Sequence, residues 1–254
     1  MSISQIEFSK ISTKLQLVSE SDDYNKIQNS VEIVNVAFLK VAVKKLENLL
    51  DRPDNKDRNN LFDRLMNLYN GRIREHQVMY LLMHIIETTL RAKGASVISK
   101  KFSTDETDDW WHDIRQINKS LLDPLMLGMK SSHRQNLNAE DMNTFEFFDS
   151  ITFNQLQKIY RDFWSDFKDD FLSKDYKGHS LPALDKKQFD AKLNHIRNAR
   201  NDIAHHKPIN HSTGRTRKNL IEDIELILCH LGFNLNESVN DIDPNHQIIQ
   251  LKYI

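Results

Sequence analysis

The chain has 254 residues, of which 39% are hydrophobic and 28% are charged, and its formal net charge is -1 at pH 7. A chain of this length can bury a substantial core, as one domain or as two small ones. It contains only six glycines and five prolines, which disfavours a turn-rich all-β fold and a long disordered linker. Cys229 is the single cysteine, so an intrachain disulfide and a cysteine-based zinc site are excluded.

The sequence contains no stretch that approaches the length of a membrane-spanning apolar helix, and its first residues lack the apolar region of a signal peptide. We therefore expect a cytoplasmic protein that makes no contact with a membrane.

Apolar residues recur at spacings of three and four along most of the chain, which is typical of helices rather than strands. The spacing predicts one long helix from Asp23 to Leu50. It predicts a shorter helix from about Leu61 that ends at Asn70-Gly71, and a third long helix from about Arg74 to Lys100. These helices would form the frame of a bundle.

The middle of the chain is less regular. Residues 120–137 predict short helices and a loop, and residues 138–171 are rich in aromatic side chains. Aromatic residues at helical spacing form a core or a subunit interface more often than a surface for stacking bases, so we assign no ligand to them.

The last third of the chain predicts a loop from Gly178 to Leu184, followed by a helix that Asp185 caps and Pro208 ends or bends. A polar loop covers residues 210–216, and a final amphipathic helix runs to Leu231, where Gly232 closes it. Weak alternation over residues 248–254 is compatible with a short C-terminal strand. The predicted fold is a single all-α domain over residues 1–254.

Charge is concentrated in one segment. Residues 186–218 contain nine lysines or arginines and two acidic residues, a local balance of +7, whereas the rest of the chain carries -8. A basic segment on an acidic body can attract phosphates, although a solvated basic helix has the same pattern.

Within this segment, one arginine lies at an unexpected position. On an ideal helix the residues Phe189, Leu193, Ile196, Ala199 and Ile203 form one apolar stripe, and Arg200 falls inside it. An unpaired guanidinium is costly to bury, so Arg200 requires a carboxylate, a partner subunit or a bound phosphate.

The segment from Arg200 to His205 reads R-N-D-I-A-H and resembles the R-x4-6-H motif of the HEPN superfamily, most closely its Abi-like (abortive infection) branch. Upstream, the residues from Glu87 to Arg91 resemble the E-x2-L-R element of the same branch. The resemblance implies a helical HEPN bundle with additional helices, paired into a homodimer. Members of this type are commonly metal-independent endoribonucleases of phage defence or toxin-antitoxin systems, and others only bind RNA or protein.

The residue types suit that chemistry. Cleavage of RNA without a metal uses the 2′-hydroxyl as nucleophile, and it needs proton transfer and positive charge at the phosphate. Histidine transfers protons near neutral pH, so His205 is the candidate acid or base. Arginine grips phosphate oxygens in a fork, so Arg200 is the candidate clamp, and Asn201 would orient His205 or a phosphate oxygen.

Spacing favours a site shared between two subunits. Residues five apart on an ideal helix point about 140° away from each other, so Arg200 and His205 would not share a face. Asn201 lies four residues before His205, and Arg197 continues that row. We therefore expect a homodimer with a composite active site.

Three supporting residues carry alternative interpretations. Glu87 is the candidate carboxylate for Arg200, or it pairs with Arg91 four residues later on the same helix. Asp202 has a role in the site or is a surface or capping residue. His206 is a second proton donor or a solvated neighbour.

No cofactor is expected. Adjacent histidines diverge by about 100° on a helix, and the sequence has no H-E-x-x-H spacing, so we expect no metal. Phosphate-binding and dinucleotide-binding glycine motifs are absent from the sequence.

The leading interpretation is a homodimeric ribonuclease that cleaves cellular or phage RNA. The alternatives are a non-catalytic HEPN module that binds RNA or a partner such as an antitoxin, and a helical scaffold in which the motif is accidental.

Overall fold

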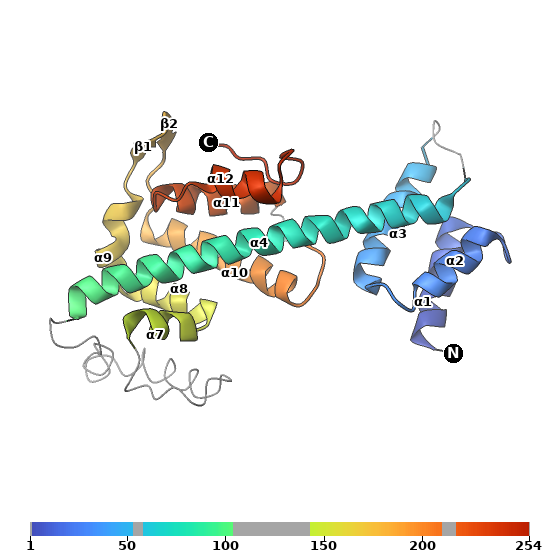
Figure 1. The fold of residues 1–254 in the computed structure, drawn as a ribbon, viewed down its shortest axis with the longest axis horizontal. Coiled ribbons are helices and arrows are strands. Elements are labelled where there is room, and N and C mark those ends of the chain that lie inside the picture. The colour runs from blue at the N-terminus through green and yellow to red at the C-terminus, as the bar shows by residue number, and fades with distance from the viewer. Residues whose placement is uncertain (1, 53–57, 104–142, 210–216, 254) are drawn as a thin grey trace. The chain divides into compact units, whose positions relative to one another are not determined.

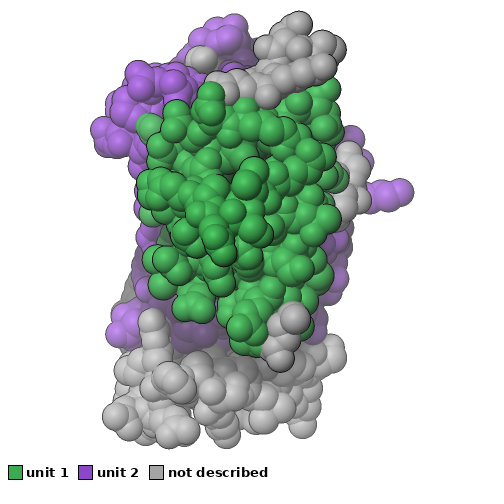
Figure 2. All heavy atoms as spheres, turned by 90° about the vertical axis from the view of Figure 1, so that its right-hand side faces the viewer, with its two compact units in different colours: residues 1–80, 202–210 green, residues 81–201, 211–254 purple. Residues whose placement is uncertain are grey.

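The computed structural model describes residues 2–52, 58–103, 143–209 and 217–253. The chain forms two compact units, which Figure 2 colours separately. Unit 1 comprises residues 1–80 and 202–210, and unit 2 comprises residues 81–201 and 211–254. The expectations for residues 120–137 and 210–216 lie outside the described residues.

Figure 1 shows that helices make up most of the described chain, as predicted. In chain order the elements are α1 (Ile3–Leu15), α2 (Asp22–Ser30), α3 (Val36–Leu50), α4 (Leu61–Phe102), α7 (Thr144–Ser150), α8 (Phe153–Asp162), α9 (Trp164–Phe167), the 3-10 helix η2 (Lys168–Phe171), β1 (Lys174–Tyr176), β2 (His179–Leu181), α10 (Lys186–Ala204), α11 (Arg217–His230) and α12 (Leu235–Ile242). The fold is all-α with one small hairpin.

Unit 1 is built on α1, α2, α3 and the first half of α4. Its core is a cluster of buried aliphatic residues together with Phe8. The predicted helix from Asp23 to Leu50 is wrong, because it is broken into α2 and α3. The side chain of Asn35 accepts hydrogen bonds from the N–H groups of Ala37 and Phe38 and thereby starts α3.

The predicted helix end at Asn70-Gly71 is also wrong, because α4 runs through it for 42 residues. A glycine in a helix costs only about 1 kcal/mol, and the buried residues on both sides of Gly71 outweigh that cost. Asp23 fixes the start of α4, since its carboxylate accepts the N–H groups of Leu61 and Phe62, each at 3.0 Å.

Unit 2 contains the aromatic residues of the middle segment, and these form a core as predicted. The side chains of Phe147, Phe148, Tyr160, Phe167 and Phe171 are buried. Within this core the Tyr160 hydroxyl donates to the Leu90 carbonyl of α4 at 2.8 Å. Phe171 in turn lies against Phe189 of α10, with 4.5 Å between the ring centroids. The core thus joins α4, α8, η2 and α10.

The strands do not lie where the sequence suggested. β1 and β2 pair antiparallel around Lys177 and Gly178, which both have positive φ, and β2 lies within the segment predicted as a loop. That backbone geometry suits a two-residue hairpin turn. Residues 248–253 form no strand, because the N–H groups of Lys252 and Tyr253 donate to the buried carboxylate of Glu225 instead.

Helix α11 is buried on nearly all sides and ends at His230. Gly232, which has φ of 77°, closes it in the following turn as predicted. Cys229 is buried within it. Among the described residues, no helix has both the length and the apolar character that a membrane crossing requires.

His230 gives unit 2 a pH-dependent stability. It is 1% exposed and its Nε2 donates to the Pro182 carbonyl. Burial lowers its pKa below the ordinary 6.5. The unfolded chain therefore binds this proton more readily, and the stability that His230 contributes is present above pH 6.5 and lost as the pH falls through the lowered value.

We expect the free energy of unfolding in urea to fall between about pH 7.5 and about pH 5, and to fall less in His230→Phe. Because the two proteins differ only at position 230, the difference between their pH dependences reports the contribution of His230 and not that of the other histidines. An identical pH dependence in both proteins contradicts the assignment.

Candidate functional site

The motif lies at the C-terminal end of α10. Asp185 caps this helix as predicted, because its carboxylate accepts the Gln188 N–H at 2.7 Å while the Gln188 side chain accepts the Asp185 N–H. The apolar stripe is buried at Phe189, Leu193, Ile196 and Ile203. This burial orients α10 within the fold.

Arg200 is not a core residue, which corrects the expectation from the stripe. Its side chain is 39% exposed. An arginine has a long stem, so its base can lie beside the stripe while its guanidinium reaches the edge. Arg200 nevertheless has a carboxylate partner, which lies on α4.

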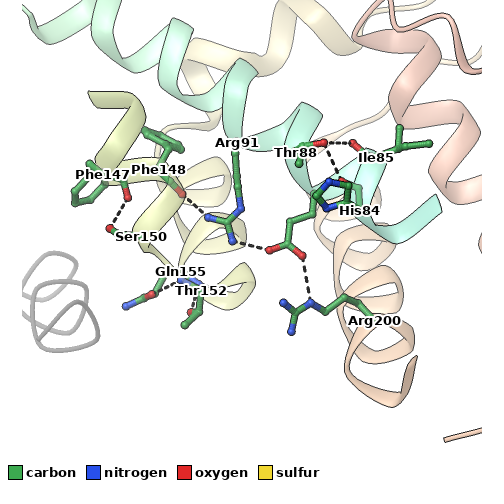
Figure 3. Close-up of polar contacts among 11 residues, drawn as sticks. His84, Ile85, Thr88, Arg91, Phe147, Phe148, Ser150, Thr152, Gln155 and Arg200 are labelled. Carbon is green, nitrogen blue, oxygen red and sulfur yellow. Dashed lines mark hydrogen bonds and ion pairs between the residues drawn. The ribbon is translucent and has the colours of Figure 1, made fainter. Parts of the chain in front are cut away.

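Glu87 pairs with two arginines at once (Figure 3). Its Oε2 lies 3.2 Å from Nε of Arg200, and its Oε1 lies 2.6 Å from Nη2 of Arg91. Both contacts of Glu87 are therefore present. The Glu87 and Arg91 side chains are only 15% and 12% exposed, so this pair is largely buried rather than a surface pair.

Figure 3 also shows why Arg91 is fixed: its guanidinium lies between the carboxylate and the Phe148 carbonyl of α7, to which it donates. Gly94 makes this approach of α7 to α4 feasible. A Cβ atom at position 94 would lie 2.4 Å from the Phe148 ring, so any residue larger than glycine would displace that ring. The sequence analysis did not identify this glycine, and only the structure shows what it contacts.

Arg200 uses only one of its nitrogens in this network. Nε contacts Glu87, and within the described part of the chain its terminal nitrogens form no hydrogen bond or ion pair. These two nitrogens are the pair that grips a phosphate in a bidentate contact. Arg200 is thus held by its inner nitrogen and available at its outer ones.

Arg197 lies one turn before Arg200 and pairs with neutral groups. It donates to the side-chain oxygens of Asn154 on α8 and Asn194 on α10. Arg91, Arg197 and Arg200 therefore share a single carboxylate, Glu87, among their observed side-chain partners. The local charge is positive, as the sequence predicted for this segment.

The helix ends before the histidines. α10 stops at Ala204, the N–H of His206 donates to the Ile203 carbonyl, and the N–H of Lys207 donates to the Asp202 carbonyl. His206 has φ of 52°. This is a Schellman turn, in which His205 is the cap residue and His206 adopts the left-handed conformation.

The angle of about 140° between Arg200 and His205 assumed an ideal helix through His205, whereas α10 ends at Ala204. The backbone carbonyl of Asp202 takes part in the turn, and its carboxylate lies 3.9 Å from Nζ of Lys207. The side chains of Asn201, His205 and His206 are exposed. Arg200 and Asn201 belong to unit 2, whereas residues 202–206 belong to unit 1.

Other polar groups of unit 2 lie away from the motif in the sequence. Asp223 of α11 pairs with Lys192 and with Nδ1 of His195 at 2.7 Å. Burial raises the pKa of Asp223, but these two hydrogen bonds outweigh it and the net pKa is lowered. A cavity of about 590 Å³ adjoins Asp223, and no predicted site residue lines it. Within the described residues, no group of three His, Cys, Asp or Glu side chains could hold a metal ion.

A comparison of the sequence with family models gives a match. The model of the Abi-like proteins matches residues 43–211, which is 169 of the 254 residues. The chain therefore belongs to the Abi-like protein family. The matched region includes both Glu87 to Arg91 and Arg200 to His205. No curated protein and no solved structure matches the chain.

Proposed function

We propose that this Abi-like protein is a HEPN-type endoribonuclease that cleaves RNA without a metal ion, as part of phage defence or as a toxin. The observation that carries the proposal is the arrangement of Arg200, whose inner nitrogen is held by Glu87 while its outer nitrogens are unengaged by the described residues. The same helix ends at Ala204, and His205 follows it with its side chain exposed to solvent.

A polyanion is the substrate class that the charges favour. Arg91, Arg197 and Arg200 have one carboxylate between them, so the surface near the end of α10 keeps excess positive charge. Phosphate groups of a nucleic acid provide repeated negative charges, and arginine binds them with defined geometry.

RNA is favoured over DNA because the proposed chemistry needs a 2′-hydroxyl. The 2′-oxygen attacks phosphorus, the bond from phosphorus to the 5′-oxygen breaks, and a 2′,3′-cyclic phosphate forms. The 2′-hydroxyl loses its proton to a base, and the leaving 5′-oxygen gains one from an acid. His205 acts in this proton transfer, Arg200 stabilises the charge on the phosphate, and Asn201 orients one of them.

The proposal includes a homodimer with a site composed of residues from both copies. In such a dimer, Arg200 of one copy acts together with His205 of the other copy on a single phosphate. An antitoxin or another regulatory protein is the further partner that a toxin requires.

The experiment is cleavage of single-stranded RNA by the purified protein in excess EDTA. We expect cuts that leave 2′,3′-cyclic phosphate ends, and no cleavage of DNA of the same sequence. Cleavage that EDTA abolishes would contradict the metal-free mechanism. Binding of RNA without cleavage would instead favour a HEPN module that only binds RNA or a partner protein.

A further inference from the structure

His76 of α4 contacts the end of α10 within unit 1. Its Nε2 lies 2.9 Å from the Ile203 carbonyl oxygen. A carbonyl oxygen only accepts hydrogen bonds, so Nε2 carries a proton and donates it. Ile203 lies two residues before His205, and its carbonyl also accepts the His206 N–H. His76 therefore reinforces one of the carbonyls that define the Schellman turn.

The His76 ring is fixed on two sides. It meets the ring of Phe38 edge-on, with centroids 5.2 Å apart and an angle of 82°. On another side it lies 5.8 Å from the His206 ring, at an angle of 36°. Phe38 is 3% exposed, so it provides a rigid support for the imidazole.

Asn35 adds a second contact at the same turn. Its side-chain oxygen caps α3, and its Nδ2 donates to the His206 carbonyl at 3.5 Å. His206 is a non-glycine residue with positive φ, a conformation that persists where its surroundings support it. His76 and Asn35 provide that support from two separate elements.

We propose that His76 is a positioning residue for His205, and this inference rests on the proposed function of His205. The backbone of the turn that follows a cap residue determines the direction in which the side chain of that residue points. By holding Ile203 and His206, on either side of His205, His76 sets where the exposed imidazole of His205 points. His76 itself donates to the backbone and takes no part in proton transfer.

The test compares His76→Phe, which keeps a ring against Phe38 and His206 but loses the donor, with His76→Gln, whose amide N–H can restore it. Two quantities are measured: steady-state cleavage of RNA, and hydrogen exchange of the His206 and Lys207 amides. We expect His76→Phe to lower kcat about tenfold with KM unchanged, because a misplaced catalytic group slows the chemical step more than it weakens binding.

In the same variant we expect the two amides to exchange about tenfold faster, since the turn has lost one of its fixed carbonyls. His76→Gln should restore both quantities toward wild type. Wild-type exchange and kcat in His76→Phe would overturn the proposal, as would equal impairment in both variants. If wild-type protein cuts no RNA, the proposed function fails, and the exchange data still decide whether His76 anchors the turn.

Discussion

Replacing His205 with alanine is expected to lower the rate of RNA cleavage in EDTA by about 10³-fold, which is within the range that proton transfer by a positioned side chain contributes. The side chain is exposed and forms no hydrogen bond to a described residue, so its removal should leave the free energy of unfolding within about 0.5 kcal/mol of wild type. RNA affinity should change little. The measurements are kcat, the RNA dissociation constant and urea unfolding.

His179→Ala is the matched control. His179 is an exposed histidine on β2, outside the motif, and its replacement should leave kcat unchanged. Full activity of His205→Ala would exclude this residue as the acid or base. His206→Ala then becomes the next variant to measure, because His206 is the adjacent exposed histidine.

The second large effect concerns Arg200. We expect Arg200→Ala to lower kcat/KM by about 10²-fold to 10³-fold, because it removes a charge stabiliser from the phosphate. If the site is composite, a dimer made of one Arg200→Ala chain and one His205→Ala chain contains one intact site. Two different affinity tags on co-expressed chains allow this mixed dimer to be isolated, and we expect about half of the wild-type activity.

The double variant, with both substitutions in the same chain, controls for the mixing. A dimer of one double-variant chain and one single-variant chain contains no intact composite site. Its activity should therefore stay at the level of the single variants. Failure of the mixed dimer to recover activity, with dimerisation intact, would place Arg200 and His205 of one site in the same chain.

Local signals in the sequence predicted several features correctly. The three-and-four spacing of apolar residues identified the helical fold, since each helix buries one face. Asp185 and Gly232 marked a helix start and a helix end because each acts within one turn of the backbone. The expectation of a carboxylate for Arg200 assumed a buried guanidinium, and Glu87 provides that contact although the Arg200 side chain is partly exposed.

Other features depended on contacts distant in the sequence. Periodicity continued across Val31 to Asn35, so the break between α2 and α3 was not visible, and Gly71 suggested an end that tertiary packing overrides. The tail resembled a strand because its alternation was read without Glu225, whose carboxylate takes the backbone N–H groups that a strand would use.

The candidate site was predicted in its residue types but not in its geometry. An ideal helix was assumed through His205, whereas α10 ends one residue earlier. His76 was not identified at all, because it lies 127 residues before Ile203 and no local pattern marks it. Only its contact with the Ile203 carbonyl in the structure identifies it.

The sharing of Glu87 between two arginines also affects how binding responds to salt. A nucleic acid that binds arginines releases the cations condensed on its phosphates, so the affinity of the protein for it falls steeply as ionic strength rises. Glu87 acts as a built-in counterion for Arg91 and Arg200. Because this tethered carboxylate already neutralises part of the arginine charge, a phosphate that binds the outer nitrogens of Arg200 displaces fewer anions from the protein, and we expect this part of the affinity to depend less on ionic strength.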